Sequence, residues 1–290
     1  MASALGDFGR RLGVQRYLSL YGLLSGLLMV AGVIAVLFPI AWMVFASMRP
    51  LAETFGSPPA WIPREITGDA YAKIFSDPRQ LRYQLNTYII SFSTAILSVG
   101  LGALAAYGFS RFRIWGAEFI LLTIMALQML PGVSIIIPFY NLARSAGVWN
   151  TYLGMIMADT VFALAISIWL LKSYIDSIPT DLEEAATVDG CNRLQALYKI
   201  VLPLLAPGLV GTGTFAFLYA WNDFVFATIL RNGHELMPMT VAIGNFFTQA
   251  NRDWNAIMAL NTMATLPLIA IFVFLQRWVI EGMTAGALKE

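Results

Sequence analysis

The sequence predicts an all-α membrane protein with six transmembrane helices. Of its 290 residues, 58% are hydrophobic and only 12% are charged, and the mean hydropathy is +0.69, which is too apolar for a water-soluble domain of this size. Six apolar stretches reach the length of about 20 residues that a helix needs to cross a membrane. The stretches are continuously apolar rather than alternating, so helices are the expected spanning elements.

The predicted spans follow in order along the chain. They cover approximately residues 18–46, 85–109, 117–140, 152–171, 208–230 and 257–280. The first stretch exceeds the apolar core of a signal peptide, which has about 7 to 15 residues, so we expect it to be retained. In the second span, Gly100, Gly102, Ala103 and Ala106 suit either tight helix packing or lipid-facing positions. Because no hydrophilic stretch is long enough for a separate domain, residues 1–290 are predicted to form a single transmembrane domain.

The basic residues predict that both termini lie in the cytoplasm. An even number of spans puts the two termini on one side of the membrane. With the N-terminus inside, the cytoplasmic segments hold ten Lys and Arg residues and the external loops hold eight. The bias is firmest in the short link between the second and third spans, which contains Arg111 and Arg113, because short loops follow the positive-inside rule best.

The inventory of side chains excludes several classes of function. A net charge of +1 provides no field that would attract nucleic acid. The single cysteine, Cys191, and the single histidine, His234, cannot build an internal disulfide or a histidine-based metal site. No glycine is followed by lysine, so the chain lacks a phosphate-binding loop for ATP. We therefore predict no catalytic residue, no metal site and no cofactor in this chain.

Residues 172–205, between the fourth and fifth spans, carry helix signals of their own. Thr180, with Glu183 three residues later, predicts a capping box, so a short helix should begin at about Asp181. Gly190 suits the left-handed turn that ends many helices. These signals predict a structured cytoplasmic loop rather than a simple connector.

A second short helix is predicted after that turn. Asn192 with Gln195 offers another cap. Five apolar residues then recur at helical spacing before Pro203 stops the helix, namely Leu194, Leu197, Tyr198, Val201 and Leu202. Two short helices at an angle would make a compact knob that another protein can approach closely. A surface hairpin resting on the bilayer is the alternative.

The same loop resembles a motif of a known family. Glu184-Ala185-Ala186, Gly190, Ile200 and Leu202-Pro203 match the seven fixed letters of the EAA motif of ABC importer permeases at the same offsets. Seven letters at fixed spacing in this context are a specific pattern. The resemblance extends over nearly the whole chain and points to the carbohydrate-uptake branch, to the MalG-type subunit of maltose permeases. Its other features include Asn86-Thr87, Ala105-Ala106-Tyr107 ahead of Arg111, Gly147 with Asn150-Thr151, and Trp221-Asn222-Asp223-Phe224.

The resemblance implies half of a transport pathway with a cytoplasmic coupling-helix loop. A permease of this family pairs with a second, homologous subunit, and a dimer of ATPase subunits docks on the cytoplasmic face. An extracytoplasmic solute-binding protein delivers the substrate. ATP and magnesium would be bound by the ATPase, and this chain would span a bacterial or archaeal cytoplasmic membrane in contact with lipid.

The resemblance also implies which residues couple to the ATPase. They are Glu184, Ala185, Ala186, Asp189, Gly190, Ile200, Leu202 and Pro203. Glu184 would contact a basic group on the ATPase, the two alanines would pack closely, and Gly190 would make the turn. The last three would hold the second helix in place. A solvated acid at a helix N-terminus is the alternative role for Glu184.

A polar and aromatic cluster in the fifth span is predicted to line the translocation pathway or a gate. It comprises Tyr219, Trp221, Asn222 and Asp223. A straight helix from Gly208, with its rise of 1.5 Å per residue, would put Asp223 roughly 22 Å along the span. A stacking face beside hydrogen-bonding groups suits a sugar, and a packing or gating cluster at a subunit interface is the alternative.

Other functions stay open at this point. Within the family, the solute could be a polyol or a glycerol phosphate rather than a sugar. A secondary transporter would couple to ions through intramembrane ionisable groups, but Asp159 and Asp223 are the only clear carboxylates in the spans. An intramembrane hydrolase would need a nucleophile with a base, and the sole histidine lies in a loop without a paired motif.

Overall fold

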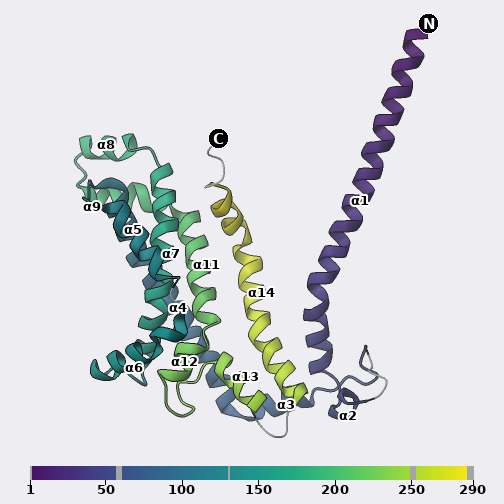
Figure 1. Cartoon of the computed structure of the whole chain (residues 1–290), viewed down its shortest axis with the longest axis vertical. Helices are drawn as coiled ribbons and strands as arrows, with labels where there is room; N and C mark the ends of the chain where they lie inside the picture. The colour runs from purple at the N-terminus through teal and green to yellow at the C-terminus, as the bar shows by residue number, and fades with distance from the viewer. Residues whose placement is uncertain (1, 57–60, 130, 249–252, 286–290) are drawn as a thin grey trace. The chain divides into compact units, whose positions relative to one another are not determined.

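The computed structural model describes residues 2–56, 61–129, 131–248 and 253–285. Within these residues the chain is helical and contains no strand, as Figure 1 shows. The long helices are α1 (Ala2–Ser47), α4 (Pro78–Arg111), α7 (Tyr152–Ser177), α11 (Ala206–Trp221) and α14 (Trp254–Ala285). The shorter ones are α2 (Leu51–Thr54), α3 (Asp69–Ser76), α5 (Ala117–Leu127), η1 (Gly132–Ile135), α6 (Ile136–Ser145), α8 (Asp181–Val188), α9 (Arg193–Ala196), the π-helix η2 (Leu197–Val201), α10 (Leu202–Leu204), α12 (Val225–Ile229) and α13 (Met239–Thr248).

Several of these helices are long and apolar enough to cross a membrane. Four qualify alone, namely α4, α7 and the segments Tyr21–Ser47 of α1 and Trp254–Trp278 of α14. Two bent pairs, α5 with η1 and α6, and the α9 to α10 segment with α11, would raise the number to six. The predicted all-α membrane class is therefore confirmed with four to six candidate spans, and the count of six stays a prediction.

The predicted third span, residues 117–140, is not one helix. Pro131 precedes η1 in an extended conformation, with φ −62° and ψ 121°. Proline has no backbone N–H to donate, so it cannot make the hydrogen bond that would continue a helix from α5. The chain therefore turns between α5 and η1, and this segment crosses a membrane only as a bent pair.

By its internal contacts the chain divides into two compact units, residues 1–71 with 253–262 and residues 72–252 with 263–290. The smaller unit is held by the buried amide of Asn255. Its Nδ2 donates to the Arg49 carbonyl at 2.6 Å, and its Oδ1 accepts from the Thr54 hydroxyl at 2.9 Å. The single functional domain over residues 1–290 stays a prediction.

The larger unit is built on α4, α7 and α11, which pack along one another, as Figure 1 shows. Gly102 permits the close approach of α4 and α7, because a Cβ there would lie 3.0 Å from Cβ of Ser167. Ala103 and Ala106 are also buried, whereas Gly100 is exposed and has no neighbour within 4 Å of such a Cβ. Of the small residues singled out in the sequence, three are packing positions and Gly100 is not.

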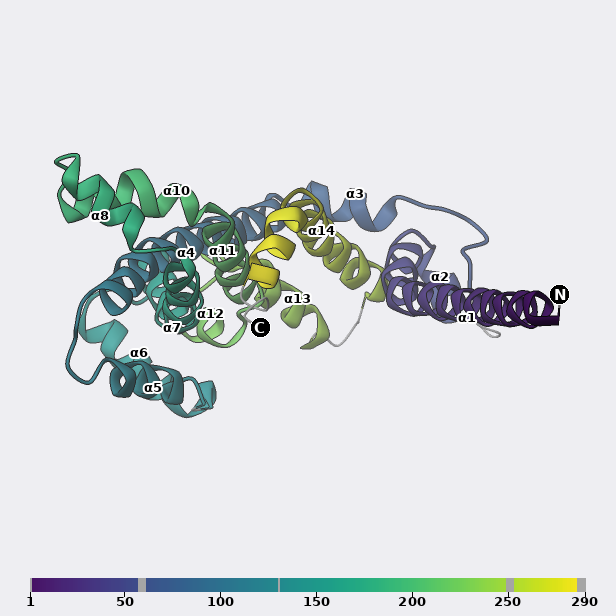
Figure 2. The same cartoon turned by 90° about the horizontal axis from the view of Figure 1, so that it is seen from above.

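The two ends of this bundle carry different structures. In Figure 1, α8 and α9 lie at one end, and α6 and α12 lie at the other. Figure 2 shows α5 and α8 on different sides of the α4, α7 and α11 cluster. The predicted coupling motif therefore lies at one end of the bundle, and α12, the short helix that follows Trp221-Asn222-Asp223-Phe224, lies at the other.

Asn86, which is fully buried, holds the end of the bundle opposite α8. Its Nδ2 donates to the carbonyls of Glu235 at 2.9 Å and Met237 at 2.8 Å. Its Oδ1 accepts a 2.6 Å hydrogen bond from the Tyr152 hydroxyl. One amide thus joins α4, α7 and the loop that leads into α13. In the same loop, His234 is exposed, and its Nδ1 lies 2.9 Å from the Tyr83 hydroxyl.

Candidate functional site

The first helix of the loop, α8, begins at Asp181 as predicted, but its predicted capping box is wrong. Thr180 has helical backbone angles, and its side chain makes no capping hydrogen bond. Glu183 does not reach back to the start of the helix, because its carboxylate is bonded to side chains of α4. The acidic residues of the first turn still favour the helix through its dipole.

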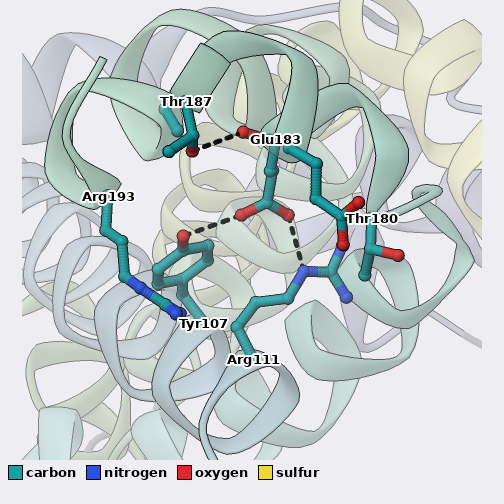
Figure 3. A pocket seen from close by; sticks show the side chains of 8 residues that line it. Tyr107, Arg111, Thr180, Glu183, Thr187 and Arg193 are labelled. Atoms are coloured by element: carbon teal, nitrogen blue, oxygen red, sulfur yellow. Dashed lines mark hydrogen bonds and ion pairs between the residues drawn. The ribbon is translucent and has the colours of Figure 1, made fainter. Parts of the chain in front are cut away.

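The Glu183 carboxylate lies between two side chains of α4, as Figure 3 shows. Its Oε2 accepts from the Tyr107 hydroxyl at 2.7 Å, and its Oε1 accepts from Nε of Arg111 at 2.6 Å. The Arg111 guanidinium also donates to the carbonyls of Ile175 at 3.0 Å and Ile178 at 2.8 Å, at the end of α7. The network therefore joins α8 to the ends of two long helices.

A pocket of about 430 Å³ opens beside this network. It is lined by Tyr107, Arg111, Thr180, Glu183, Glu184, Thr187, Arg193 and Ala196. Figure 3 shows Arg193 on the side of Tyr107 away from Arg111, and its guanidinium lies 5.2 Å from the centre of the Phe112 ring. The pocket brings acidic and basic groups together where the predicted coupling loop meets the end of α4.

The motif residues divide into an exposed set and an inward set. Glu184, Ala185, Asp189, Gly190 and Pro203 are exposed, Ile200 and Leu202 are partly buried, and Ala186 is the buried residue of α8. Gly190 has φ +86°, which confirms the predicted left-handed turn. The two alanines therefore face in different directions, and only Ala185 is free to contact another protein.

The second helix of the loop is longer and less regular than predicted. The capping box of Asn192 and Gln195 is confirmed, since each side chain bonds the other residue's backbone N–H at 2.9 Å. The helix then becomes the π-helix η2 and runs to Leu204, where it meets α11 at 78°. Pro203 lies in the short helix α10, so the predicted stop at this residue is one residue early.

The predicted apolar stripe of this helix is not a single buried face. Leu197 and Val201 are buried against Ala103, Ala106 and Tyr107 of α4 and against α7. Leu194 and Tyr198, however, are exposed. The shift from α-helical to π-helical geometry changes which side chains align, so a count at 3.6 residues per turn fails here.

The loop consequently presents large apolar side chains to its surroundings. Val188 is 87% exposed, and Leu182, Leu194 and Tyr198 are also exposed. Glu184 of the same loop is also exposed, and within the residues that the structure describes its carboxylate has no hydrogen-bond partner. Large exposed apolar side chains that gather on one surface are typical of contact with another protein or with a membrane.

The predicted cluster at the end of the fifth span is divided by the end of a helix. α11 ends at Trp221, so the straight helix assumed for residues 208–230 is wrong. Trp221 is buried against Tyr88 and Phe217, while the ring of Tyr219 stacks on Phe162, with 6.1 Å between ring centres. These two aromatic residues are packing groups in this unit.

Asp223 has a local role that the sequence did not predict. Its carboxylate accepts backbone hydrogen bonds from Val225 at 3.2 Å, Phe226 at 3.3 Å and Ala227 at 2.8 Å, which supplies the free N–H groups at the start of α12 with acceptors. Asn222 is exposed and donates to the Leu218 carbonyl. Asp159 of α7 is buried, and within the described residues its Oδ1 has no hydrogen-bond partner.

The sequence pattern of one protein family matches residues 98–285, and the family is described as the binding-protein-dependent transport system inner membrane component. The chain belongs to this family. The matched residues include the whole loop 172–205 and α11. The resemblance inferred from the EAA motif is thereby confirmed, and the chain is a permease subunit of an ABC importer that hydrolyses no ATP itself.

Named relatives match the permease over most of its length. It is 32% identical over 253 residues to the sulfoquinovosyl glycerol transport system permease protein SmoH of Agrobacterium fabrum, covering 87% of this chain and 89% of that protein. It is 32% identical over 256 residues to the trehalose/maltose transport system permease protein MalG of Thermococcus litoralis, covering 87% and 91%. A chain in the crystal structure of a bacterial ABC transporter involved in the import of the acidic polysaccharide alginate has a TM-score of 0.75 at 24% identity, covering 89% of this permease and 96% of that chain.

Sequence reasoning did not assign the contacts that hold this site together. Tyr107 and Arg111 were part of the family resemblance, but no role followed from it. Their partners are distant in the chain, since 72 residues separate Arg111 from Glu183. The available signal was the position of a tyrosine and an arginine four residues apart at the end of a span, on one face of a helix.

Proposed function

We propose that the permease forms half of the translocation pathway of an ATP-driven, binding-protein-dependent sugar importer. A second, homologous permease supplies the other half. A dimer of ATPase subunits, which binds ATP and magnesium, docks on the cytoplasmic loop 172–205. Both termini lie in the cytoplasm, and an extracytoplasmic solute-binding protein delivers the sugar at the opposite side.

The names of its relatives support a carbohydrate as substrate. SmoH and MalG are named for sulfoquinovosyl glycerol and for trehalose and maltose. Each is similar to this permease over more than four fifths of both chains. Similarity of this extent supports the same general class of solute.

The exposure of Glu184 is the observation that carries the coupling proposal. Glu183 and Glu184 are neighbours in α8, yet Glu183 is bonded to Tyr107 and Arg111 within the permease. Glu184 is exposed, and it lines the open pocket beside this network. An ion pair with a basic group of the ATPase would satisfy it, and truncating such a desolvated contact costs about 2 to 5 kcal/mol.

The segment after α11 is proposed as a gate rather than as a sugar-stacking site. Trp221 and Tyr219 pack within the permease, and Asp223 caps α12. The break between α11 and α12 also has an exposed amide, that of Asn222. A helix break that lines a pathway is a recurrent feature of transporters.

Uptake measurements would test the proposed function. The permease, its homologous partner and the ATPase are reconstituted in proteoliposomes with a solute-binding protein outside, and uptake of labelled maltose and trehalose is followed. We expect uptake that requires both ATP and the binding protein, and that is lost in Glu184→Lys. Glu118→Lys is the matched control, because Glu118 is an exposed acid of α5, a helix that lies on a different side of the bundle from α8 (Figure 2). Uptake driven by an ion gradient without ATP would contradict the proposal.

A further inference from the structure

We infer that Tyr107, Arg111 and Glu183 are positioning residues that make α8 move together with α4 and α7. The inference rests on the proposed function, in which a partner ATPase pushes and pulls on the loop. It assigns to Glu183 a role separate from that of Glu184. Glu184 contacts the partner, and Glu183 transmits the displacement of α8 to the long helices of the permease.

The covalent connections of α8 are weak constraints on its position. Ile178, Pro179 and Thr180 link it to α7, and the left-handed turn at Gly190 follows it. Among the residues of α8 only Ala186 is buried, and the helix contacts mainly α9 and η2 of the same loop. A short helix attached in this way would rotate about its ends if nothing else fixed it.

The polar network supplies the missing constraint. Glu183 accepts from Tyr107 at 2.7 Å and from Arg111 at 2.6 Å, which fixes the carboxylate at both oxygens. The side chains of Arg111 and Glu183 are only 9% and 13% exposed, so water competes little for these bonds. A charge-assisted bond of this length is strong and directional.

Arg111 extends the constraint to α7. Its Nη2 bonds the carbonyls of Ile175 and Ile178, where the last carbonyls of a helix lack partners of their own. Its Nη1 bonds the Ser110 hydroxyl, which donates in turn to Asp176 at 2.6 Å. One guanidinium therefore connects α8, the end of α4 and the end of α7; Figure 3 shows its contact with Glu183.

The surrounding core explains why this connection transmits movement instead of absorbing it. Tyr107 is buried in the apolar cluster formed by α4, α7 and the second helix of the loop. The ring cannot swing without displacing side chains that are themselves buried, such as Leu197 and Leu171. A displacement of Glu183 consequently moves the helix ends rather than a loose side chain.

Conservative variants test this inference by the number of substrate molecules transported per ATP hydrolysed. Glu183→Gln, Arg111→Lys and Tyr107→Phe are each reconstituted with the partner permease, the ATPase and the binding protein. We expect this ratio to fall by about fivefold or more, because the coupling between two distant sites is commonly worth at least that factor. Each variant weakens the contacts through which α8 acts on α4 and α7. Assembly with the ATPase, measured by co-purification, should persist because Glu184 is intact.

Arg79→Lys is the matched control for Arg111→Lys. Arg79 also pairs with a carboxylate, that of Asp77 at 3.0 Å, but its side chain is 64% exposed. We expect the transport ratio of this variant to equal that of the wild type. An equal fall in Arg79→Lys and Arg111→Lys would show that the loss comes from the exchange of arginine for lysine in general, and would overturn the inference.

A distance measurement gives a second readout that does not depend on transport. Spin labels are placed at Val188 on α8 and at Leu104 on α4, both of them exposed, in a Cys191→Ser background that removes the single native cysteine. We expect a narrow distance distribution for the assembled wild-type complex and a broader one for Glu183→Gln and Tyr107→Phe. Unchanged distributions in both variants would overturn the inference even if transport fell.

The two experiments separate this inference from the proposed function. If the wild-type assembly shows no ATP-dependent uptake, the proposed function is wrong. If the wild type transports and either all three variants keep its transport ratio or Glu183→Gln and Tyr107→Phe both keep its distance distribution, the positioning network is wrong while the proposed function stands.

Discussion

The guanidinium of Arg111 and the carboxylate of Glu183 form an ion pair at 2.6 Å, although 72 residues separate them in the chain. The pair joins the end of a long helix to the short helix that precedes the Gly190 turn. Both side chains are largely buried, so removing one partner leaves a desolvated charge behind. This relationship makes the loop part of the bundle rather than an appendage.

We predict that Arg111→Ala destabilises the permease by about 2 to 4 kcal/mol, because the Glu183 carboxylate and two carbonyls of α7 lose their donor. The measurement is thermal unfolding in detergent, followed by tryptophan fluorescence. Arg79→Ala is the control, since its ion pair is exposed, and its melting temperature should match that of the wild type. Equal melting temperatures for Arg111→Ala and the wild type would contradict the prediction.

Asp223→Ala is predicted to destabilise α12 locally by about 1 to 2 kcal/mol, because three backbone N–H groups lose their acceptor. Hydrogen exchange of the amides in Val225–Ile229 is the direct measurement. Asp223→Asn keeps one acceptor oxygen for Val225 and Phe226 but offers no acceptor to Ala227, so its protection should lie between those of the wild type and Asp223→Ala. Equal exchange in Asp223→Ala and the wild type would show that the carboxylate does not cap the helix.

Asn86→Ala is predicted to cost about 2 to 4 kcal/mol, because it leaves the buried Met237 carbonyl, the partly buried Glu235 carbonyl and the Tyr152 hydroxyl without their partner. Tyr152→Phe removes only one of these hydrogen bonds and should cost less. A double-mutant cycle of the two substitutions should show coupling, since they share a bond. If the changes in unfolding free energy of the two single variants add up to that of the double variant, the prediction is contradicted.

Gly208→Val is predicted to destabilise the packing of α11 on α7 by about 1 to 3 kcal/mol. A Cβ at Gly208 would lie 2.8 Å from the ring of Tyr174, a contact that requires the ring or the helix to shift. Gly211→Val in the same helix is the matched control, because a Cβ there has no neighbour within 4 Å. The two variants should differ in their yield of folded, monodisperse protein, and equal yields would contradict the prediction.

Local sequence signals predicted the local structure well. Asn192 and Gln195 cap a helix, Gly190 makes a left-handed turn, and α8 begins at Asp181. Each of these features depends on residues within a few positions of one another, so their spacing in the chain is also their spacing in space. The seven letters of the motif identified the family for the same reason.

Features that depend on distant partners were not predictable from the chain alone. Thr180 and Glu183 have the spacing of a capping box, but Arg111 offers the Glu183 carboxylate a charged donor that a backbone N–H cannot match. Asp223 looked like part of a continuous span because its neighbours are apolar. Its carboxylate instead accepts the N–H groups of a new helix, which ends the span at Trp221.

ATPase stimulation by the substrate-loaded binding protein tests the central claim of ATPase coupling through the loop most directly. Hydrolysis is measured in proteoliposomes that contain the complete assembly, with wild-type permease, Glu184→Lys and the control Glu118→Lys, which reverses the charge of an exposed acid of α5. We predict that stimulation is lost in Glu184→Lys and kept in Glu118→Lys, while all three permeases insert and fold. Full stimulation with Glu184→Lys would contradict the account, because the exposed acid of α8 would then make no contact on which coupling depends.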